Sequence, residues 1–280
     1  MSESEDEGAI TGGIVKQAID SATALAKAVP IYEDAVQPLA KETGRALGTV
    51  GKAVNVALEP LAGIVWGYEK IKDFIEARVT EKMNGVPEDR ITMPPLNVAG
   101  PAIEALRFSG NDDTLRELFA NLIATSLDKK TATEAHPSFV DIIKNMSADE
   151  GKILGLFTRS QMFPLVHVRL DLPKNGGFII LHRNFTHLGD IAKCEHTELT
   201  PNYLDNLCRL GVLEVPNGQR IAKGDPYAPL MNDDQIAELR ALHAGADGEA
   251  TIGFDRLMIR TTALGQQFVR ACVIDKALRN

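Results

Sequence analysis

Residues 111–130, NDDTLRELFANLIATSLDKK, determine what kind of structure the middle of the chain can form. Asn111 or Asp112 can cap the start of a helix, and Lys129 and Lys130 suit the negative end of a helix dipole. Apolar residues recur at helical spacing and predict one buried face, formed by Leu115, Leu118, Phe119, Leu122 and Ile123. The stretch therefore predicts an amphipathic helix packed within a bundle.

Further helices are expected on both sides of this one. PAIEALRFSG (101–110) predicts a short helix that ends at Gly110, and HPSFVDIIKNM (136–146) starts another. Ser147 and Glu150 have the spacing of a capping box ahead of GKILGLF. Before them, NGVPEDRITMPPLNVAGP (84–101) is rich in Pro and Gly and predicts an ordered connector. Residues 85–160 are thus assigned to a connector and a helical bundle.

The N-terminal part of the chain carries a long apolar repeat. Residues 1–12 begin MSESEDEG, which predicts a disordered acidic tail rather than a targeting signal. Over residues 13–84, apolar positions spaced 4-3-4-3 run from Val36 to Ile75 and predict a seam in a coiled coil or a long helical hairpin. Pro38 and Pro60 occupy the same place in AVQPLA and ALEPLA, and each is expected to kink the helix.

The segment from Ala46 to Tyr68 is apolar around its whole circumference, since Lys52 and Glu59 are its only charged residues. Such a helix has to be covered by protein or by lipid. It approaches the roughly 20 residues that cross a bilayer, but the two charges and Pro60 argue against a simple span. Small residues at helical spacing would permit close helix packing. The predicted oligomer or membrane helix uses Gly44, Leu47, Gly48, Val50, Gly51, Val54, Leu58, Leu61, Ile64, Val65 and Trp66.

Residues 161–280 change to short β-rich runs, which are FPLVHVRLDL, GGFIILHRNF, GVLEVP and RLMIRTTALG. Helical stretches separate them, and TPNYLDNLCRLGVLEV (200–215) combines a capping Thr200 with a terminating Gly211. This order predicts a winged-helix-like domain, with LEVPNGQ and FDRLMIRTTALG forming the wing. The expected fold class is α+β and predominantly helical: proline-kinked N-terminal helices, a helical middle bundle and this C-terminal domain.

Charge disfavours nucleic acid as the partner of that domain. The chain has a net charge of −8, and residues 161–280 contain 13 Lys and Arg against 14 Asp and Glu, a balance of −1. A helix that reads DNA normally presents a basic face. The exposed side chains expected on residues 200–209 instead suggest a protein contact, made by Asn202, Tyr203, Asn206 and Arg209.

Candidate chemistry is confined to His182, His187, Cys194 and His196, residue types that can all bind zinc. Their spacing matches no familiar site, so the expectation is a protein without metal, cofactor or enzymatic activity. A phosphate-binding loop, a nucleophile elbow and a His-Glu-x-x-His helix are all missing from the sequence. An unrecognised nuclease or hydrolase at these four residues remains an alternative. Three widely spaced cysteines favour reduced thiols in the cytoplasm, with membrane association as an open addition.

Several motifs resemble one family of bacterial proteins. They are LEPL at 58–61 with WGY at 66–68, AGPA at 99–102, LREL at 115–118 with ANL at 120–122, and HPSFV at 136–140. Together they are similar to the Abi-alpha family (abortive infection alpha), formerly a domain of unknown function, from roughly Ile31 to the C-terminus. The resemblance implies a role in abortive infection or related anti-phage defence, and it supplies no functional residues.

Two hypotheses follow. The leading one is a non-enzymatic defence protein that forms a homo-oligomer through its N-terminal helices, with membrane insertion or disruption as one version and a phage component as the trigger. The alternative is a winged-helix regulator or sensor that binds nucleic acid and dimerises through its helical half. The first rests on the apolar segment before Tyr68, and the second on the order of elements after residue 161.

Overall fold

The computed structural model describes residues 67–172, 176–243 and 250–279. The chain divides into two compact units, Met1–Asn145 with Ala271–Asn280, and Met146–Arg270. This division differs from the boundary expected at residues 160 and 161, because the helix after Ser147 joins the second unit and the last ten residues return to the first. The acidic tail, the proline kinks and all eleven residues of the predicted oligomer or membrane helix lie outside the described residues.

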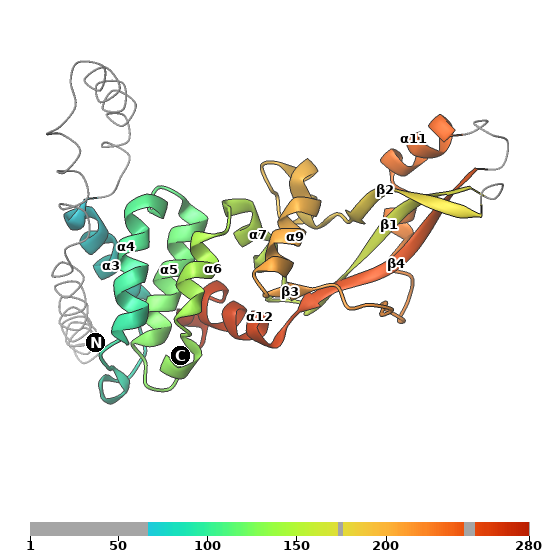
Figure 1. The fold of residues 1–280 in the computed structure, drawn as a ribbon. Coiled ribbons are helices and arrows are strands. Elements are labelled where there is room, and N and C mark those ends of the chain that lie inside the picture. The colour runs from blue at the N-terminus through green and yellow to red at the C-terminus, as the bar shows by residue number, and fades with distance from the viewer. Residues whose placement is uncertain (1–66, 173–175, 244–249, 280) are drawn as a thin grey trace, which may run out of the picture. The chain divides into compact units, whose positions relative to one another are not determined.

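The first unit is helical (Figure 1). Its helices are α3 (Tyr68–Lys82), α4 (Leu96–Ser109), α5 (Asp113–Ser126) and α6 (Ser138–Lys144). Short 3-10 turns lie at Glu88–Arg90, Ala132–Glu134 and Lys276–Arg279. Helix α5 packs against α3, α4 and α6, so it is the centre of the bundle.

Helix α5 confirms most of what its sequence predicts. The Asp112 side chain accepts a hydrogen bond from the backbone N–H of Leu115 at 2.9 Å and caps the helix. Four of the five expected core residues are buried, and Leu115 is half-buried. The helix ends at Ser126 rather than at Lys130, because the carbonyl of Asp128 accepts hydrogen bonds from Thr131 and Ala132 in a turn.

Two further helices of this unit differ from or extend the prediction. Helix α4 starts at Leu96, inside the predicted connector, and it includes the exposed Pro101 at the cost of one backbone hydrogen bond. Helix α3 buries Ile71, Ile75 and Val79 at successive helical turns. Ile71 and Ile75 are the last members of the 4-3-4-3 repeat, so the described end of the repeat is covered by the chain's own first unit.

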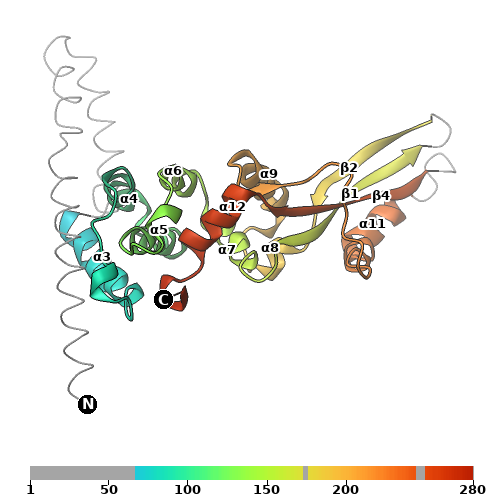
Figure 2. The ribbon, with the colours of Figure 1, turned by 90° about the horizontal axis from the view of Figure 1, so that it is seen from below.

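The second unit is built around an antiparallel sheet (Figures 1 and 2). Its strands are β1 (Met162–Leu172), β2 (Gly177–Phe185), β3 (Leu213–Glu214) and β4 (Thr251–Thr261), in the order β2-β1-β4-β3. All four predicted strands are therefore present. The helices of this unit are α7 (Ala148–Leu156), α8 (Leu188–Ile191), α9 (Thr200–Arg209), α10 (Ala228–Met231), α11 (Asp234–His243) and α12 (Ala263–Phe268).

Apolar side chains of β1 form the core beneath α10 and α11. Val166 and Val168 are fully buried, and they pack with Tyr227, Leu230 and Ile236. Val168 lies opposite Phe254 of β4, which fixes the register of the two long strands. Helix α11 has no counterpart in the sequence analysis, and its single buried residue, Ile236, explains why its apolar pattern was weak.

Of the two helix caps predicted for this unit, one is confirmed and one is wrong. The capping box of α7 is confirmed: Ser147 Oγ accepts from the Glu150 N–H at 3.3 Å, and Glu150 Oε2 accepts from the Ser147 N–H at 2.6 Å. Thr200 is wrong as the cap of α9, because its hydroxyl donates to the Thr197 carbonyl at 2.6 Å. The 3-10 turn Thr197–Leu199 runs directly into α9, so Leu199 stands at the cap position.

Candidate functional site

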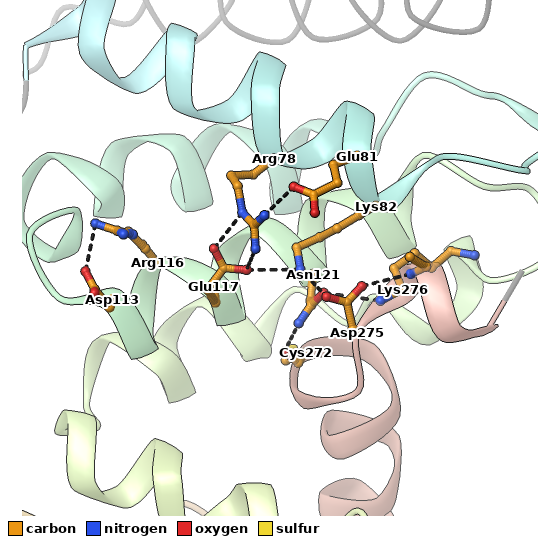
Figure 3. Close-up of polar contacts among 11 residues, drawn as sticks. Arg78, Glu81, Lys82, Asp113, Arg116, Glu117, Asn121, Cys272, Asp275 and Lys276 are labelled. Atoms are coloured by element: carbon orange, nitrogen blue, oxygen red, sulfur yellow. Dashed lines mark hydrogen bonds and ion pairs between the residues drawn. The ribbon is translucent and has the colours of Figure 1, made fainter. Parts of the chain in front are cut away.

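A group of charged side chains joins α3, α5 and the C-terminal segment of the first unit (Figure 3). We call Arg78, Lys82, Glu117 and Asp275 the α3 cluster. Arg78 donates from Nε and Nη2 to the two carboxylate oxygens of Glu117, at 2.9 and 2.8 Å. Lys82 Nζ lies 3.0 Å from Glu117 Oε2 and 2.9 Å from Asp275 Oδ2. Glu117 therefore binds two cations from α3 at once.

Burial makes these contacts obligatory for Lys82, whose side chain is only 2% exposed. A buried ammonium group is tolerated only when carboxylates or other acceptors replace its water. Burial alone would raise the pKa of Glu117, but hydrogen bonds from Arg78 and Lys82 lower the pKa below its ordinary value. Burial likewise opposes a lowered pKa for Asp275, and the hydrogen bond from Lys82 outweighs it. Both carboxylates are thus ionised at neutral pH.

A second buried ion pair fixes the end of the chain. Lys276 Nζ lies 2.8 Å from Asp128 Oδ2, and both side chains are fully buried. Arg90 Nε donates to the other oxygen of Asp128 at 3.0 Å. Burial would raise the pKa of Asp128, but hydrogen bonds from Arg90 and Lys276 lower it to about 2.

Polar side chains of α5 hold the same segment by its backbone. Asn121 Nδ2 donates to the Cys272 carbonyl at 3.0 Å, and Thr125 Oγ1 donates to the Ala271 carbonyl at 2.9 Å. The Asn121 side chain also accepts from the Lys276 N–H at 3.3 Å. The backbone of residues 271, 272 and 276 is therefore bound to α5, by side chains that were not among the predicted site residues.

A signal for these contacts does exist in the sequence. Asn121, Thr125 and Asp128 follow one another at helical spacing through FANLIATSLD, a run that is otherwise apolar apart from Ser126. Lys82 likewise falls where the stripe of Ile71, Ile75 and Val79 continues. A polar residue at a core position indicates a buried partner, although the sequence alone does not say which one.

The geometry of the α3 cluster suits an anchor. Each of its four side chains has a partner of opposite charge within 3.0 Å. The pairs connect a helix near the start of the described chain with a segment near its end, through α5. The cluster fastens α3, and α3 directly follows the apolar segment 46–66.

The predicted partner-binding helix is α9, and two of its four selected residues turn toward α7. Tyr203 Oη donates to Asp149 Oδ2 at 3.2 Å, and Asn206 Nδ2 donates to Glu150 Oε1 at 2.6 Å. Asn202 and Arg209 are exposed. The partner contact remains a prediction, and Asn202 and Arg209 are the exposed residues available to make it.

Asp149 organises the loop between α8 and α9. Its carboxylate accepts the N–H groups of Glu195 and His196 at 3.0 and 3.1 Å. Burial would raise the pKa of Asp149, but hydrogen bonds from Lys152 and from these two amides lower it to about 2. Burial and the nearby Asp149 charge raise the pKa of Tyr203 to about 12, so its hydroxyl remains a donor.

The four candidate zinc ligands do not converge. His187 Nε2 lies 2.8 Å from Asp233 Oδ2, and Cys194 Sγ points to the Asp149 carbonyl at 3.6 Å. Burial raises the pKa of Cys194 to about 11, which keeps it a thiol. Within the described ranges, no three His, Cys, Asp or Glu side chains are grouped so that they could hold a metal ion.

These observations define a predominantly helical α+β protein whose first unit is held together by buried ion pairs. The chain belongs to the Abortive infection alpha family, whose model matches residues 67–272. Membership of this family supports a role in abortive infection. A search of curated proteins found no match.

One similar solved structure is that of the uncharacterized protein from the hydrocarbon-degrading marine bacterium Alcanivorax borkumensis SK2. The two sequences are 16% identical, and the TM-score is 0.32. The match covers 50% of this chain and 92% of that chain.

Proposed function

We propose that this protein acts in abortive infection without catalysis, by self-assembly through residues 13–84, which the sequence predicts to be helical. The anchoring of α3 carries the proposal. Arg78 and Lys82 fasten α3, the described end of that segment, to α5. Family membership supplies the defence context.

The need for a partner follows from the composition of residues 46–66. That stretch has Lys52 and Glu59 as its only charges, whereas α3 alone carries Glu69, Lys70 and Asp73 as exposed charged residues in its first two turns. Burying apolar surface away from water is favourable, so these residues should pack against another apolar surface. Another copy of the chain supplies such a surface in the same place on every molecule.

A bilayer is the second surface that could cover residues 46–66. In this version the protein inserts into a membrane or disrupts it after a phage component triggers the change. The described helices include none with the length and apolar character needed to cross a membrane.

Light scattering on the full chain, combined with a dye-release assay on liposomes, tests both versions. Gly48→Leu places a large side chain where close helix packing is expected, so it should reduce both the assembled mass and the protection against phage. Gly155→Leu is the matched control, because a Cβ at Gly155 meets open space. A strictly monomeric chain that leaves liposomes intact would contradict the proposal, as would full assembly by Gly48→Leu.

A second candidate is a nucleic-acid-binding regulator. The chain order is α7, β1, β2, α8, α9, β3, α10, α11, β4. A winged-helix arrangement with α9 as the recognition helix would use α7, β1, α8, α9, β3 and β4 of this order, with β2 and the pair α10 and α11 as insertions, and β4 lies between β1 and β3 in the sheet. The exposed face of α9 carries Asn202, Asp205 and Arg209, which is not basic. Mobility shifts at two salt concentrations discriminate the candidates, because binding through phosphate contacts weakens steeply with salt.

A further inference from the structure

One continuous helix carries the chain from the second unit back into the first. Helix α12 (Ala263–Phe268) passes directly into a π-helical turn, Val269–Val273. The boundary between the two units falls inside that turn, between Arg270 and Ala271. Such turns are rare and often lie at functional sites. Within residues 263–273, no loop therefore separates the part of the helix that belongs to the second unit from the part that belongs to the first.

The start of α12 is fixed within the second unit. The Thr262 N–H donates to the Val212 carbonyl at 3.1 Å, and the Thr262 hydroxyl donates to the Gly211 carbonyl at 2.6 Å. The same hydroxyl accepts from the Gly265 N–H at 2.8 Å and caps the helix. Gly265 packs so closely on Val212 that a Cβ there would overlap the Val212 carbonyl oxygen. A larger side chain at Gly265 therefore displaces α12.

The residues that follow the boundary are fixed within the first unit. We call residues 271–276 the strap (Figure 3). Side chains of α5 bind the strap backbone at Ala271, Cys272 and Lys276. The Lys276 side chain forms the fully buried ion pair with Asp128. The two ends of one helix are thus attached to different units.

The attachment of the strap is mainly polar, which suits release. Its apolar residues are either small or only half-buried, namely Ala271, Cys272, Val273 and Ile274. An ion pair in a protein interior adds little net stability, because the loss of water around both charges offsets their attraction. When the strap leaves, Lys276 regains water and Asp128 keeps its hydrogen bond from Arg90. Neither charge is then left buried without compensation.

Asp275 connects the strap to α3. Its Oδ2 lies 2.9 Å from Nζ of Lys82, whose side chain is only 2% exposed. Removal of this carboxylate leaves the buried ammonium group with less compensation, and that favours local opening of α3. We infer that displacement of α12 withdraws the strap from the first unit and thereby releases α3. The inference rests on the proposed function for its consequence, because α3 directly follows the apolar residues 46–66.

Hydrogen exchange of the full chain tests this coupling. Gly265→Ala displaces α12, so the amides of α3 should exchange about tenfold faster than in the unsubstituted chain, while those of α6 keep their rate. Thr262→Ala removes the cap of α12 and its bond to Gly211, and this milder variant should act in the same direction. Val168→Ala is the matched control, because its cavity opens in the core beneath α10 and α11. It should leave exchange of α3 unchanged.

A flexible insertion separates pulling by α12 from a general loss of stability. Gly-Ser-Gly-Ser placed between Arg270 and Ala271 interrupts the helix at the boundary and leaves the residues of the strap intact. In the Gly265→Ala chain this insertion should restore slow exchange of α3, and by itself it should have no effect. The inference is overturned if neither Gly265→Ala nor Thr262→Ala speeds exchange of α3, if Val168→Ala speeds it equally, or if the insertion fails to restore it.

The readout does not depend on self-assembly. If α3 responds to Gly265→Ala in a protein that has the mass of a single chain, the inference holds and the proposed function is contradicted. If the chain assembles as proposed but α3 does not respond to either variant, the inference alone is overturned.

Discussion

Lys276 and Asp128 form an ion pair in which neither side chain touches solvent, with Nζ 2.8 Å from Oδ2. The two residues are 148 positions apart in the sequence. The pair therefore closes the first unit, because it binds the returning end of the chain to the turn after α5. The α3 cluster does the same for the beginning of the described chain, so α5 holds both ends.

Removal of the buried cation should destabilise the first unit. Lys276→Met leaves Asp128 buried with Arg90 as its remaining cation, and breaking one side of a buried pair costs about 3 kcal/mol or more. Urea unfolding of the full chain measures the loss. Lys130→Met, at an exposed position four residues after Ser126, is the matched control and should change stability by less than about 0.5 kcal/mol. Equal midpoints for the two variants would show that the pair contributes little.

Loss of Glu117 should release α3. Glu117→Ala removes the two hydrogen bonds between Arg78 and Glu117, so Arg78 keeps only Glu81, and it leaves the buried Lys82 with Asp275. Hydrogen exchange of residues 68–82 should become faster than in the unsubstituted chain, since a buried ammonium group that has lost one of its two carboxylates favours local opening. Glu104→Ala on the exposed face of α4 provides the comparison. If α3 exchanged its amide hydrogens at the same rate in Glu117→Ala, the cluster would not be what anchors α3.

Stability should fall in acid over a defined range. The pKa of Asp128 and that of Asp149 are each about 2 in the folded chain, against an ordinary value of 3.8. A lowered folded pKa stabilises the protein above the ordinary value, and this contribution is lost as pH falls from about 4 to about 2. The urea midpoint of the unsubstituted chain should fall through that range. The midpoint of Asp149→Asn should fall less steeply with pH than that of Asp190→Asn. Parallel curves for the two variants would contradict the assignment to Asp149.

Two glycine substitutions in the second unit should change the stability of the protein in opposite directions. A Cβ at Gly265 would lie 1.8 Å from the Val212 carbonyl oxygen, so Gly265→Ala forces α12 away from the residue that leads into β3. We expect a loss of about 3 kcal/mol or more. Gly155 lies within α7 with open space around it, and Gly155→Ala should stabilise by up to about 1 kcal/mol. Thermal unfolding of the two variants checks both values, and a shift in the same direction would show that the close approach is relieved elsewhere.

Local signals in the sequence were sufficient for most elements. The Asp112 cap, the Ser147–Glu150 capping box and the four strands act over a few residues, and each is confirmed. Local signals failed where neighbouring structure decides. Thr200 is a good cap in isolation, but the 3-10 turn before it sets the start of α9. Pro101 was expected to start a helix, yet α4 begins five residues earlier, because Val98 and Ala99 are buried in the core of the first unit.

The α3 cluster depends on contacts between distant parts of the sequence and was not predicted. Glu117 and Asp275 both bind Lys82, and Asp275 is 193 positions away from it. Helical periodicity identifies Lys82 as a core position but cannot supply the partner. Tyr203 is a similar case. Its place in the sequence suggested an exposed contact residue, but its hydroxyl donates a hydrogen bond to Asp149, which is 54 positions away.

The most direct test of self-assembly is the mass of the full chain in solution, compared with that of Leu58→Glu. The account predicts a mass above the 30.4 kDa of one chain, and a return to that value in Leu58→Glu. A single-chain mass for the unsubstituted chain, or an unchanged assembly in Leu58→Glu, would contradict it.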